Sequence, residues 1–318
     1  MIKRVAQPLE DAYRGSLVAD ALAMPVHWYY DREALDRDYP NLTVFQAPKR
    51  YHPDSIFWRS SYTPLNEKGD ILHDQAEFWG MRHVHYHQNL QAGENTANFK
   101  LATALFEQVS EAGSYDAEAW LDLYIEKMLT PGWHRDTYLE EYHRAFFTNY
   151  AQGKAPMKCG IRDEHIGGLA QVPALVAALP SIPREALRQI VKTHVALTHR
   201  HSNVLRAADC LTRLLLDLQS GIPLREAIMR SAGDWFSTRK AMKWEDRPDR
   251  TVIGRLLSPA CYIAESFPAA LYFAWKYHDA FGKALIANAK VGGDSCHRGA
   301  VIGSLVALSD RQGFRQWC

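Results

Sequence analysis

A helical spacing of apolar residues is the pattern that most constrains the fold of this chain. In residues 9–24, LEDAYRGSLVADALAM, apolar side chains recur three or four positions apart, at Leu9, Tyr13, Leu17, Ala21 and Met24. This spacing places them on one face of a helix, because one helical turn takes 3.6 residues. Similar stripes run through residues 96–112, 117–129, 136–150, 184–197, 203–218, 260–275 and 297–308. No stretch shows sustained alternation, so the pattern predicts an all-α fold, without a β-sheet.

The length of 318 residues and the absence of a fixed-period repeat favour a single domain over residues 1–318. Two segments break the helical pattern, residues 25–73 and residues 232–258. The first is rich in aromatic, proline and polar residues. A long irregular segment of this kind is either a surface excursion or a lid over a ligand, and the sequence leaves both open.

The charge balance excludes several classes of partner. The net charge is +1, so nothing favours nucleic acid or an anionic membrane surface as a partner.

No segment approaches the ~20 apolar residues of a membrane span, and the opening residues MIKRVAQPLED lack the apolar core of a secretion signal. Five scattered cysteines without a C-x-x-C pair are typical of reduced thiols. We therefore expect a cytoplasmic protein.

The stretch VGGDSCHRGAVIG, residues 291–303, combines a glycine turn with several polar side chains. Gly292 and Gly293 precede Asp294, which the pattern places at the N-cap of a helix. Free N–H groups at such a turn also suit an anion or an oxygen-rich ligand. A helix cap and a ligand site are both consistent with these residues.

Two further turns have a similar character. Residues 93–96 place Glu94, Asn95 and Thr96 at the start of an amphipathic helix. Between two other helical stripes, His199 and His201 lie in a turn where they could contact a phosphate or ribose. In each turn the alternative is a structural role, as a helix cap or as a polar connection.

Histidine and cysteine raise the question of a metal or a nucleophile. His83, His85 and His87 share a face if that segment is extended, which invites a metal site, although polar loops also carry histidines. Cys296 at a helix start could be a reactive thiol, or a small buried side chain. Because adjacent helical residues point about 100° apart, Cys296 and His297 need not act as nucleophile and base.

Four segments in this order resemble the ADP-ribosylglycohydrolase family, the all-α hydrolases that include the dinitrogenase-reductase-activating enzyme. EDAYRGSLVADALAMPVHWYY is similar to the family's opening motif, GENTANFKLATALFEQV to its T-D-D-T turn and helix, VALTHRHSNVLRAADCL to its T-H-x-H segment, and ALIANAKVGGDSCHRGAVIGSLVAL to its G-G-D-T-D-T signature. The resemblance implies a compact orthogonal helical bundle. It also implies a site for two Mg²⁺ ions that hold and polarise a ribose.

The site residues implied by the resemblance depart from the family pattern. Glu94 and Asn95 replace two aspartates, Cys296 and His297 replace the second half of the signature, and His27 replaces the opening glutamate, whereas Asp294 and Thr96 match. Two carboxylates then remain where the family has four. Adjacent Mg²⁺ ions need oxygen ligands and negative charge, and thiol and imidazole suit them poorly. We expect no di-magnesium centre, and either no metal or a single Mg²⁺ on Glu94 and Asp294.

We therefore expect a hydrolase that cleaves a glycosidic bond to a ribosyl group by an altered mechanism, with ADP-ribosyl or related nucleotide or nucleoside compounds as substrates, free or attached to a protein. The alternatives are a catalytically silent protein that binds a ribosyl ligand or has a structural role, and a transition-metal protein. The expected catalytic residues are Glu94, Asp294, His27 and His297. The expected substrate-binding residues are Asn95, Thr96, His199, His201, Gly292, Gly293 and Cys296.

Overall fold

Helices account for almost all the regular structure of residues 8–318, the part of the chain that this computed structural model describes. Only isolated β-bridges, and no strand, occur within these residues, so the predicted all-α class is confirmed. The α-helices are α1 Pro8–Ala23, α2 Arg32–Asp38, α3 Ala97–Ala112, α4 Ala117–Leu129, α5 Glu141–Ala151, α6 Val172–Ala178, α7 Arg184–Ala196, α8 Ser202–Gln219, α9 Leu224–Ser231, α10 Thr238–Trp244, α11 Asp249–Thr251, α12 Ile263–Lys276, α13 Phe281–Val291, α14 Ser295–Ser309 and α15 Arg311–Phe314.

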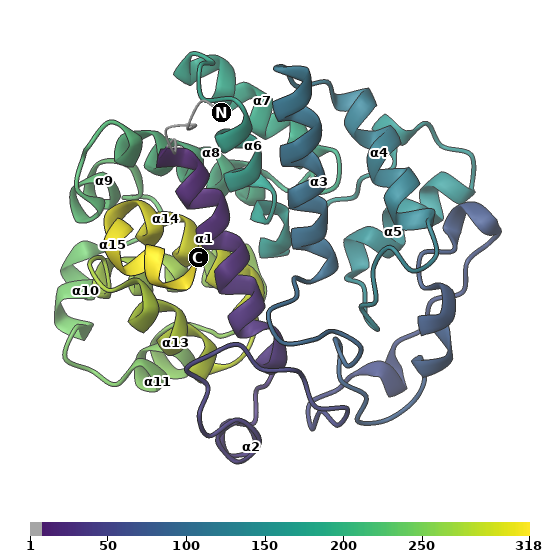
Figure 1. The fold of residues 1–318 in the computed structure, drawn as a ribbon, viewed down its shortest axis with the longest axis horizontal. Helices are drawn as coiled ribbons and strands as arrows, with labels where there is room; N and C mark the ends of the chain where they lie inside the picture. The colour runs from purple at the N-terminus through teal and green to yellow at the C-terminus, as the bar shows by residue number, and fades with distance from the viewer. Residues whose placement is uncertain (1–7) are drawn as a thin grey trace.

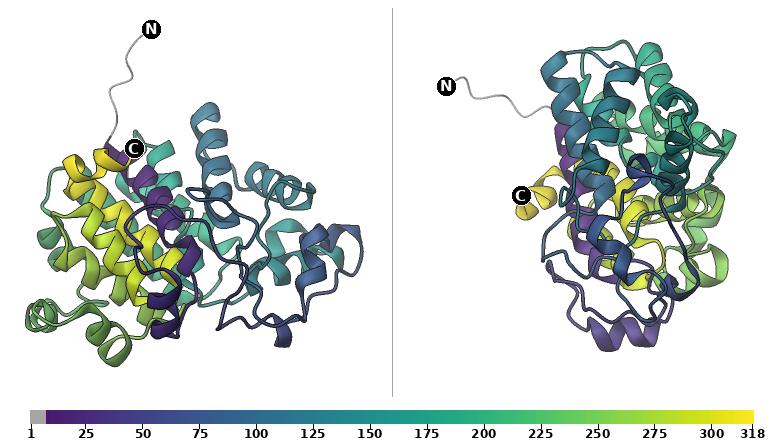
Figure 2. Two further views of the ribbon diagram at one scale, coloured as in Figure 1. Left: turned by 60° about the horizontal axis from the view of Figure 1, so that its bottom comes forward. Right: turned by 90° about the vertical axis from the view of Figure 1, so that its right-hand side faces the viewer.

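Helices α1 and α14 pack side by side in antiparallel directions, although they are far apart in the sequence (Figures 1 and 2). Their backbones touch at two glycines. A Cβ atom on Gly303 would lie 2.2 Å from the carbonyl oxygen of Gly15, and one on Gly15 would lie 2.4 Å from that of Gly303. This close approach of the two helices therefore requires glycine at both positions. It brings the C-terminal end of α1 close to the N-terminal end of α14.

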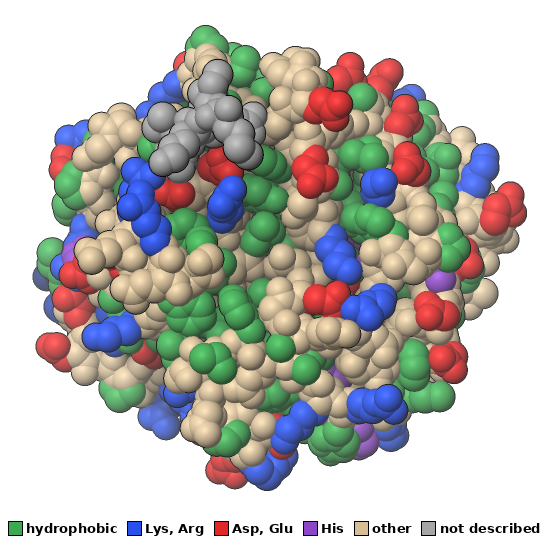
Figure 3. All heavy atoms as spheres, viewed as in Figure 1, with side chains coloured by type: hydrophobic (Ala, Val, Ile, Leu, Met, Phe, Trp, Pro, Cys, Tyr) green, Lys and Arg blue, Asp and Glu red, His purple; other side chains and the backbone are tan. Residues whose placement is uncertain are grey.

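The main core extends from Leu9 to Phe314 and includes buried residues of most helices. Helix α14 is buried on all sides from Ser295 to Ala307, so it is the central helix of the bundle. On the surface, acidic and basic side chains are interspersed over the face shown in Figure 3. No helix within residues 8–318 is long and apolar enough to cross a membrane.

Both segments that break the helical pattern contain short elements. In residues 25–73 these include α2 and the 3-10 turns Phe57–Arg59 and Glu67–Gly69. In residues 232–258 they are α10, α11 and the π-helical turn Val252–Leu256. Two aromatic side chains of the first segment, Trp28 and Phe57, are buried in a small separate core, where both pack against Tyr86. This segment forms one wall of the cleft described below.

Candidate active site

The glycine turn before α14 holds two chain segments in contact. Gly292 and Gly293 have φ angles of 72° and 68°, and added Cβ atoms would lie 2.1 Å from the carbonyl oxygen of Tyr29 and 2.2 Å from that of Pro259. The backbone of Gly293 also bonds to residues 28 and 29, with distances of 2.8 and 2.6 Å. The buried guanidinium of Arg298 donates to the carbonyl oxygen of Gly292 (2.8 Å). The two glycines therefore position the backbone.

Asp294 caps α14 and is completely buried. Its Oδ1 atom accepts from the backbone N–H of His297 (3.2 Å), and it lies 2.9 Å from Nδ1 of His297 and 3.2 Å from Nε2 of His27. Its Oδ2 atom has no hydrogen-bond partner within residues 8–318, and Nε2 of His165 lies 3.5 Å away. Burial alone would raise the pKa of Asp294, but the charge of His297 and the hydrogen bonds hold it well below its usual value.

His27 continues into a buried chain of hydrogen bonds. Its Nδ1 atom lies 2.8 Å from Nε2 of His87, and Nδ1 of His87 lies 2.5 Å from Oδ1 of Asp136. The other oxygen of Asp136 accepts from the N–H of Ala97 at the start of α3 (2.8 Å). Burial lowers the pKa of His27 and His87 to about 3 and raises that of Asp136 to about 6. Both imidazoles are therefore neutral near pH 7. Two neutral rings carry two protons, so all three contacts between Asp294 and Asp136 are hydrogen bonds only when Asp136 is protonated.

His297 links Asp294 to a second carboxyl group. Its Nε2 atom lies 3.4 Å from Oε1 of Glu140, which also accepts from the side-chain amide of Asn98 (3.0 Å). Burial opposes a charge on His297, but the Asp294 carboxylate outweighs it and raises the pKa of His297 to about 9. Burial raises the pKa of Glu140 to about 7, although the charge of His297 opposes this. At neutral pH the Glu140 carboxyl group is therefore poised to gain or lose a proton.

A cleft of about 510 Å³ lies next to this network, and Glu140 and His165 belong to its lining. Nδ1 of His165 accepts from the N–H of Gly167 (2.8 Å), so the neutral ring carries its proton on Nε2, the atom near Asp294. The other lining residues are mainly aromatic or acidic. They are Trp28, Tyr30, Asp54, Ile56, Arg59, Tyr86, Tyr138, Glu141, Asp163, Ala260, Cys261 and Tyr262.

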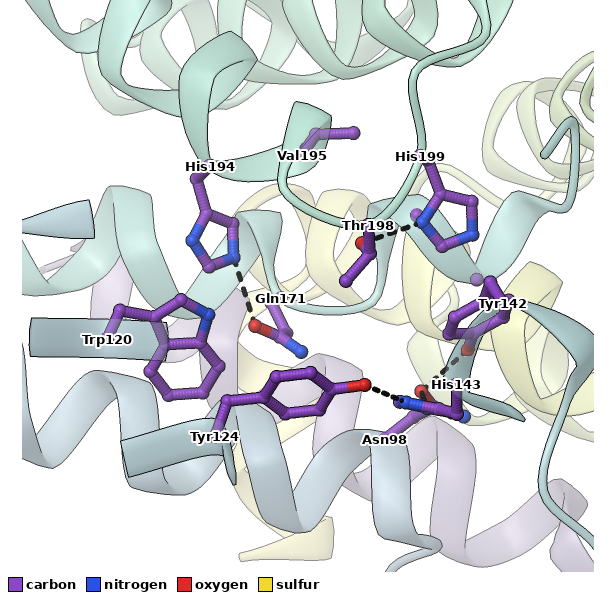
Figure 4. Close-up of a pocket in the computed structure, with 12 residues that line it drawn as sticks. Asn98, Trp120, Tyr124, Tyr142, His143, Gln171, His194, Val195, Thr198 and His199 are labelled. Carbon is purple, nitrogen blue, oxygen red and sulfur yellow. Dashed lines mark hydrogen bonds between the residues drawn. The ribbon is translucent and has the colours of Figure 1, made fainter. Parts of the chain in front are cut away.

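A second cavity, of about 20 Å³, lies on the other side of Asn98 (Figure 4). This volume suits one water molecule and is far too small for a sugar. The amide oxygen of Asn98 accepts from the hydroxyl of Tyr142 (2.7 Å) and lies 2.9 Å from Nε2 of His143. The other ring nitrogen of His143, Nδ1, lies 2.6 Å from the hydroxyl of Tyr124. These bonds fix the Asn98 amide so that its nitrogen faces Glu140.

The structure brings together three of the residues expected at the site, namely His27, Asp294 and His297. It places Glu94 elsewhere, in a partly exposed ion pair with Arg135 (2.5 Å). The groups of potential metal-ligating atoms that contain Asp294, within residues 8–318, do not include Glu94. The expected cation on Glu94 and Asp294 therefore has no support in this geometry. The reason is that Arg135, which the sequence pattern did not single out, satisfies the Glu94 carboxylate.

The turn at residues 94–96 is fastened to α1. Asp20, which is fully buried, accepts from the side-chain amide of Asn95 (2.9 Å) and from both the N–H (2.9 Å) and the hydroxyl (3.0 Å) of Thr96. The buried thiol of Cys296 points to the carbonyl oxygen of Asp20, and burial raises its pKa well above the usual value. These bonds use the polar groups that we expected to contact a substrate.

The other histidines singled out from the sequence also fall into two groups, those with structural contacts and one that belongs to the Asp294 network. His199 is buried against Tyr142 beside the small cavity, and His201 caps α8, where its ring accepts from the N–H of Asn203 (3.3 Å). His83 is exposed and stacks on Tyr51. His85 lies 3.0 Å from the carbonyl oxygen of Pro25 and accepts from the backbone N–H of His87 (3.0 Å). Of the three rings at 83, 85 and 87, only that of His87 lies in the chain of contacts to Asp294.

Sequence reasoning missed Glu140, His165, Asn98 and Asp136. Glu140 is the N-cap residue of α5 in the stretch YLEEYHRAFF, and this acidic helix start was its only signal in the sequence. His165 and Asp136 lie in irregular segments, where nothing in the local pattern shows what they contact.

The donor atoms near Asp294 do not fit a pair of magnesium ions. Within residues 8–318 they form two groups, His27 with Asp294 and His297, and His165 with Cys261 and Asp294, so a single carboxylate serves both. Imidazole and thiol are poor ligands for Mg²⁺, which prefers oxygen. The His165 nitrogen in the second group also carries a proton in the neutral ring. No step of the chemistry proposed below therefore uses a magnesium ion.

Comparison with known proteins agrees with this architecture. A sequence model of the family described as ADP-ribosylglycohydrolase matches residues 6–310. The fold is similar to a solved structure of an ADP-ribosylglycohydrolase-related protein complex, with a TM-score of 0.61 and 19% identity, over 96% of this chain and 87% of that chain. A search of curated protein sequences found no match. Because the family match spans nearly all of the sequence, the chain belongs to the ADP-ribosylglycohydrolase family.

Proposed function

We propose that the protein is a hydrolase that cleaves the glycosidic bond of a riboside, with Glu140 as the proton-transfer residue and without a di-magnesium centre. The observation that carries this proposal is the position of Glu140. It is a buried carboxyl group with a pKa of about 7, it lines the large cleft, and His297 and Asn98 hold it in place. A general acid or base is most effective when its pKa is close to the working pH.

In this proposal the bond between C1 of the ribose and the leaving nitrogen or oxygen breaks, and a water oxygen bonds to C1. Protonated Glu140 gives its proton to a leaving group that needs one, or ionised Glu140 takes a proton from the attacking water. Asp294 is completely buried and acts indirectly. Its charge holds His297 as an imidazolium, which lies 3.4 Å from Glu140 and lowers the pKa of that carboxyl group.

The test is release of free sugar from ADP-ribosylated protein, ADP-ribose conjugates and nucleosides, with and without EDTA. Wild type should hydrolyse at least one class, EDTA should leave the rate unchanged, and Glu140→Gln should lower kcat/KM by about 10²–10⁴-fold. Glu111→Gln, at the exposed end of α3, is a matched control and should behave as wild type. Release of sugar from none of these compounds would remove the hydrolase proposal, and an unaffected Glu140→Gln variant would remove the role of Glu140.

One observation supports a second candidate, a riboside-binding protein without catalysis. Glu94 and Asn95, which occupy positions of family metal ligands, are both held in structural bonds. Calorimetry separates the two candidates, since a ligand that binds tightly and is recovered unchanged supports binding alone.

A further inference from the structure

The charge of the large cleft limits which ribosides it can take. Its lining within residues 8–318 includes four carboxyl groups, one arginine and no lysine. None of the four carboxyl groups forms an ion pair with a lysine or arginine in this part of the chain. The four carboxyl groups belong to Asp54, Glu140, Glu141 and Asp163. Even with Glu140 protonated, the remaining three leave the cleft with an excess of negative charge.

The acidic side chains are held in place by the backbone. Asp54 accepts from the N–H groups of Tyr30 (2.7 Å) and Asp31 (2.9 Å), and Asp163 accepts from the N–H of His165 (2.8 Å). These bonds position the two carboxyl groups at the cleft. Burial raises the pKa of Asp163, although the hydrogen bond from the N–H of His165 opposes this. The acidic lining is therefore part of the folded structure around the cleft.

Among the described residues, the cleft offers few groups that bind phosphate. Proteins bind phosphate mainly with arginine, lysine and free N–H groups at helix starts. Two helices start at the cleft, and both starts are acidic. Helix α5 has Glu140 at its N-cap and Glu141 in its first turn. Helix α12 follows Tyr262, has Glu265 in its first turn, and its first N–H donates to the carbonyl oxygen of Glu164 (2.8 Å). Arg59 is the single guanidinium of the lining, and it lies 5.8 Å from the ring of Trp58. A diphosphate in this cleft would meet more negative than positive charge.

Aromatic side chains supply the remaining walls. Trp28 stacks on His27 with ring centroids 3.8 Å apart, and Tyr86 and Tyr138 meet its edge at 4.7 and 5.3 Å. Tyr30 and Tyr262 are about half exposed and also line the cleft. Aromatic faces beside carboxylates attract a flat ring that carries a positive charge.

We propose, resting on the proposed function, that the cleft binds ribosides without phosphate and disfavours ADP-ribose. The leaving group of these ribosides is an aromatic ring that is cationic or neutral while it is bound to C1. Hydrolysis of a cationic N-riboside balances without a proton donor. The electron pair of the C1–N bond goes to the ring nitrogen, the ring leaves uncharged, and water bonds to C1 and gives its proton to ionised Glu140.

Binding of three probes by the full chain tests this inference. We expect nicotinamide riboside, a cationic N-riboside, to bind more tightly than the uncharged nucleoside inosine, and ADP-ribose to bind at least ~10-fold more weakly than nicotinamide riboside. Added salt should weaken the binding of nicotinamide riboside, because salt screens the attraction between unlike charges. ADP-ribose binding more tightly than nicotinamide riboside would overturn the inference.

Charge reversal at the cleft sharpens the test. Glu141→Lys should reduce the preference for nicotinamide riboside over ADP-ribose by about 10-fold or more, since it changes the local charge by two units. Glu111→Lys makes the same change outside the cleft and should leave the preference as in wild type. An unchanged preference in Glu141→Lys contradicts the inference.

The two proposals can fail separately. Hydrolysis of ADP-ribosyl compounds in preference to phosphate-free ribosides would overturn the inference and leave the hydrolase proposal in place. Tight binding of nicotinamide riboside that is recovered intact, with no turnover of any riboside, would support the cleft chemistry and remove the hydrolase proposal.

Discussion

The turns before α3 and α14 look alike in sequence and serve different purposes in the structure. Each has a glycine with positive φ, 84° at Gly93 and 72° at Gly292, followed by acidic or amide side chains at a helix start. The turn before α14 presents Asp294 to His27 and His297. The turn before α3 is fastened to α1 through Asp20. The side chains that distant segments place beside each turn therefore decide which turn contributes a charged group to the site.

Removal of Asp294 should have the largest effect on stability. Asp294→Ala leaves the His297 imidazolium buried without its anion, and breaking a buried pair in this way costs about 3–5 kcal/mol. Urea denaturation at pH 7 measures the loss. The comparison predicts a much smaller loss for Glu94→Ala, and equal losses in the two variants would remove the distinction between the turns.

The Asp294–His297 pair should also give stability a pH dependence of known sign. The pKa of His297 is raised from 6.5 to about 9 in the folded protein, so its contribution is complete below pH 6.5 and is lost as pH rises through 9. The slope for one proton is at most about 1.4 kcal/mol per pH unit. Denaturation between pH 6.5 and 8.5 should show a weaker fall for the double variant Glu140→Gln/His297→Gln than for Glu140→Gln alone.

Taking the difference between these two proteins removes the contribution of groups that titrate independently of His297. Glu140 is replaced in both proteins, because the charge of His297 lowers its pKa and loss of that charge would change how it titrates. Identical pH profiles for the two proteins would show that His297 is not charged in the folded protein.

Asp20 gives the corresponding test for the other turn. Asp20→Asn keeps the shape of the side chain but turns an amide toward donors of Asn95 and Thr96, which should cost about 1–3 kcal/mol. Asp11→Asn is a matched control on the same helix, since Asp11 bonds to the partly exposed Arg311 (2.7 Å). A loss no greater than that of the control would show that Asp20 does not hold the turn.

Glu94 should give the smallest effect. Its ion pair with Arg135 is 30% and 42% exposed at the two side chains, and such pairs contribute less than about 1 kcal/mol. Glu94→Gln should therefore change both the unfolding free energy and the rate of riboside hydrolysis very little. A 10-fold loss of activity in Glu94→Gln would show that Glu94 takes part in the reaction.

The sequence predicted the helices where apolar periodicity was strong. The stripes at 117–129 and 203–218 correspond to α4 and α8, whereas α6 and α13 were not foreseen. Every residue of α6 is apolar and buried, so it has no stripe. Helix α13 does have one, at Phe281, Ala284, Leu285 and Ala289, which we overlooked in the sequence. Within the site, the position of Asp294 at a helix cap followed from local chemistry. Glu140 and His165 could not be foreseen, because segments far from Asp294 in the chain bring them to it.

The contact between Gly15 and Gly303 has a consequence for how the protein is made. The ribosome synthesises α1 long before α14, so the face of α1 that holds Gly15 lacks its partner in the fold until α14 has emerged. Contacts between such distant segments form late and slow the folding of a chain. The site also forms late, because His27 follows α1 and Asp294 precedes α14. Nascent chains that stop before α14 are therefore unable to assemble the site.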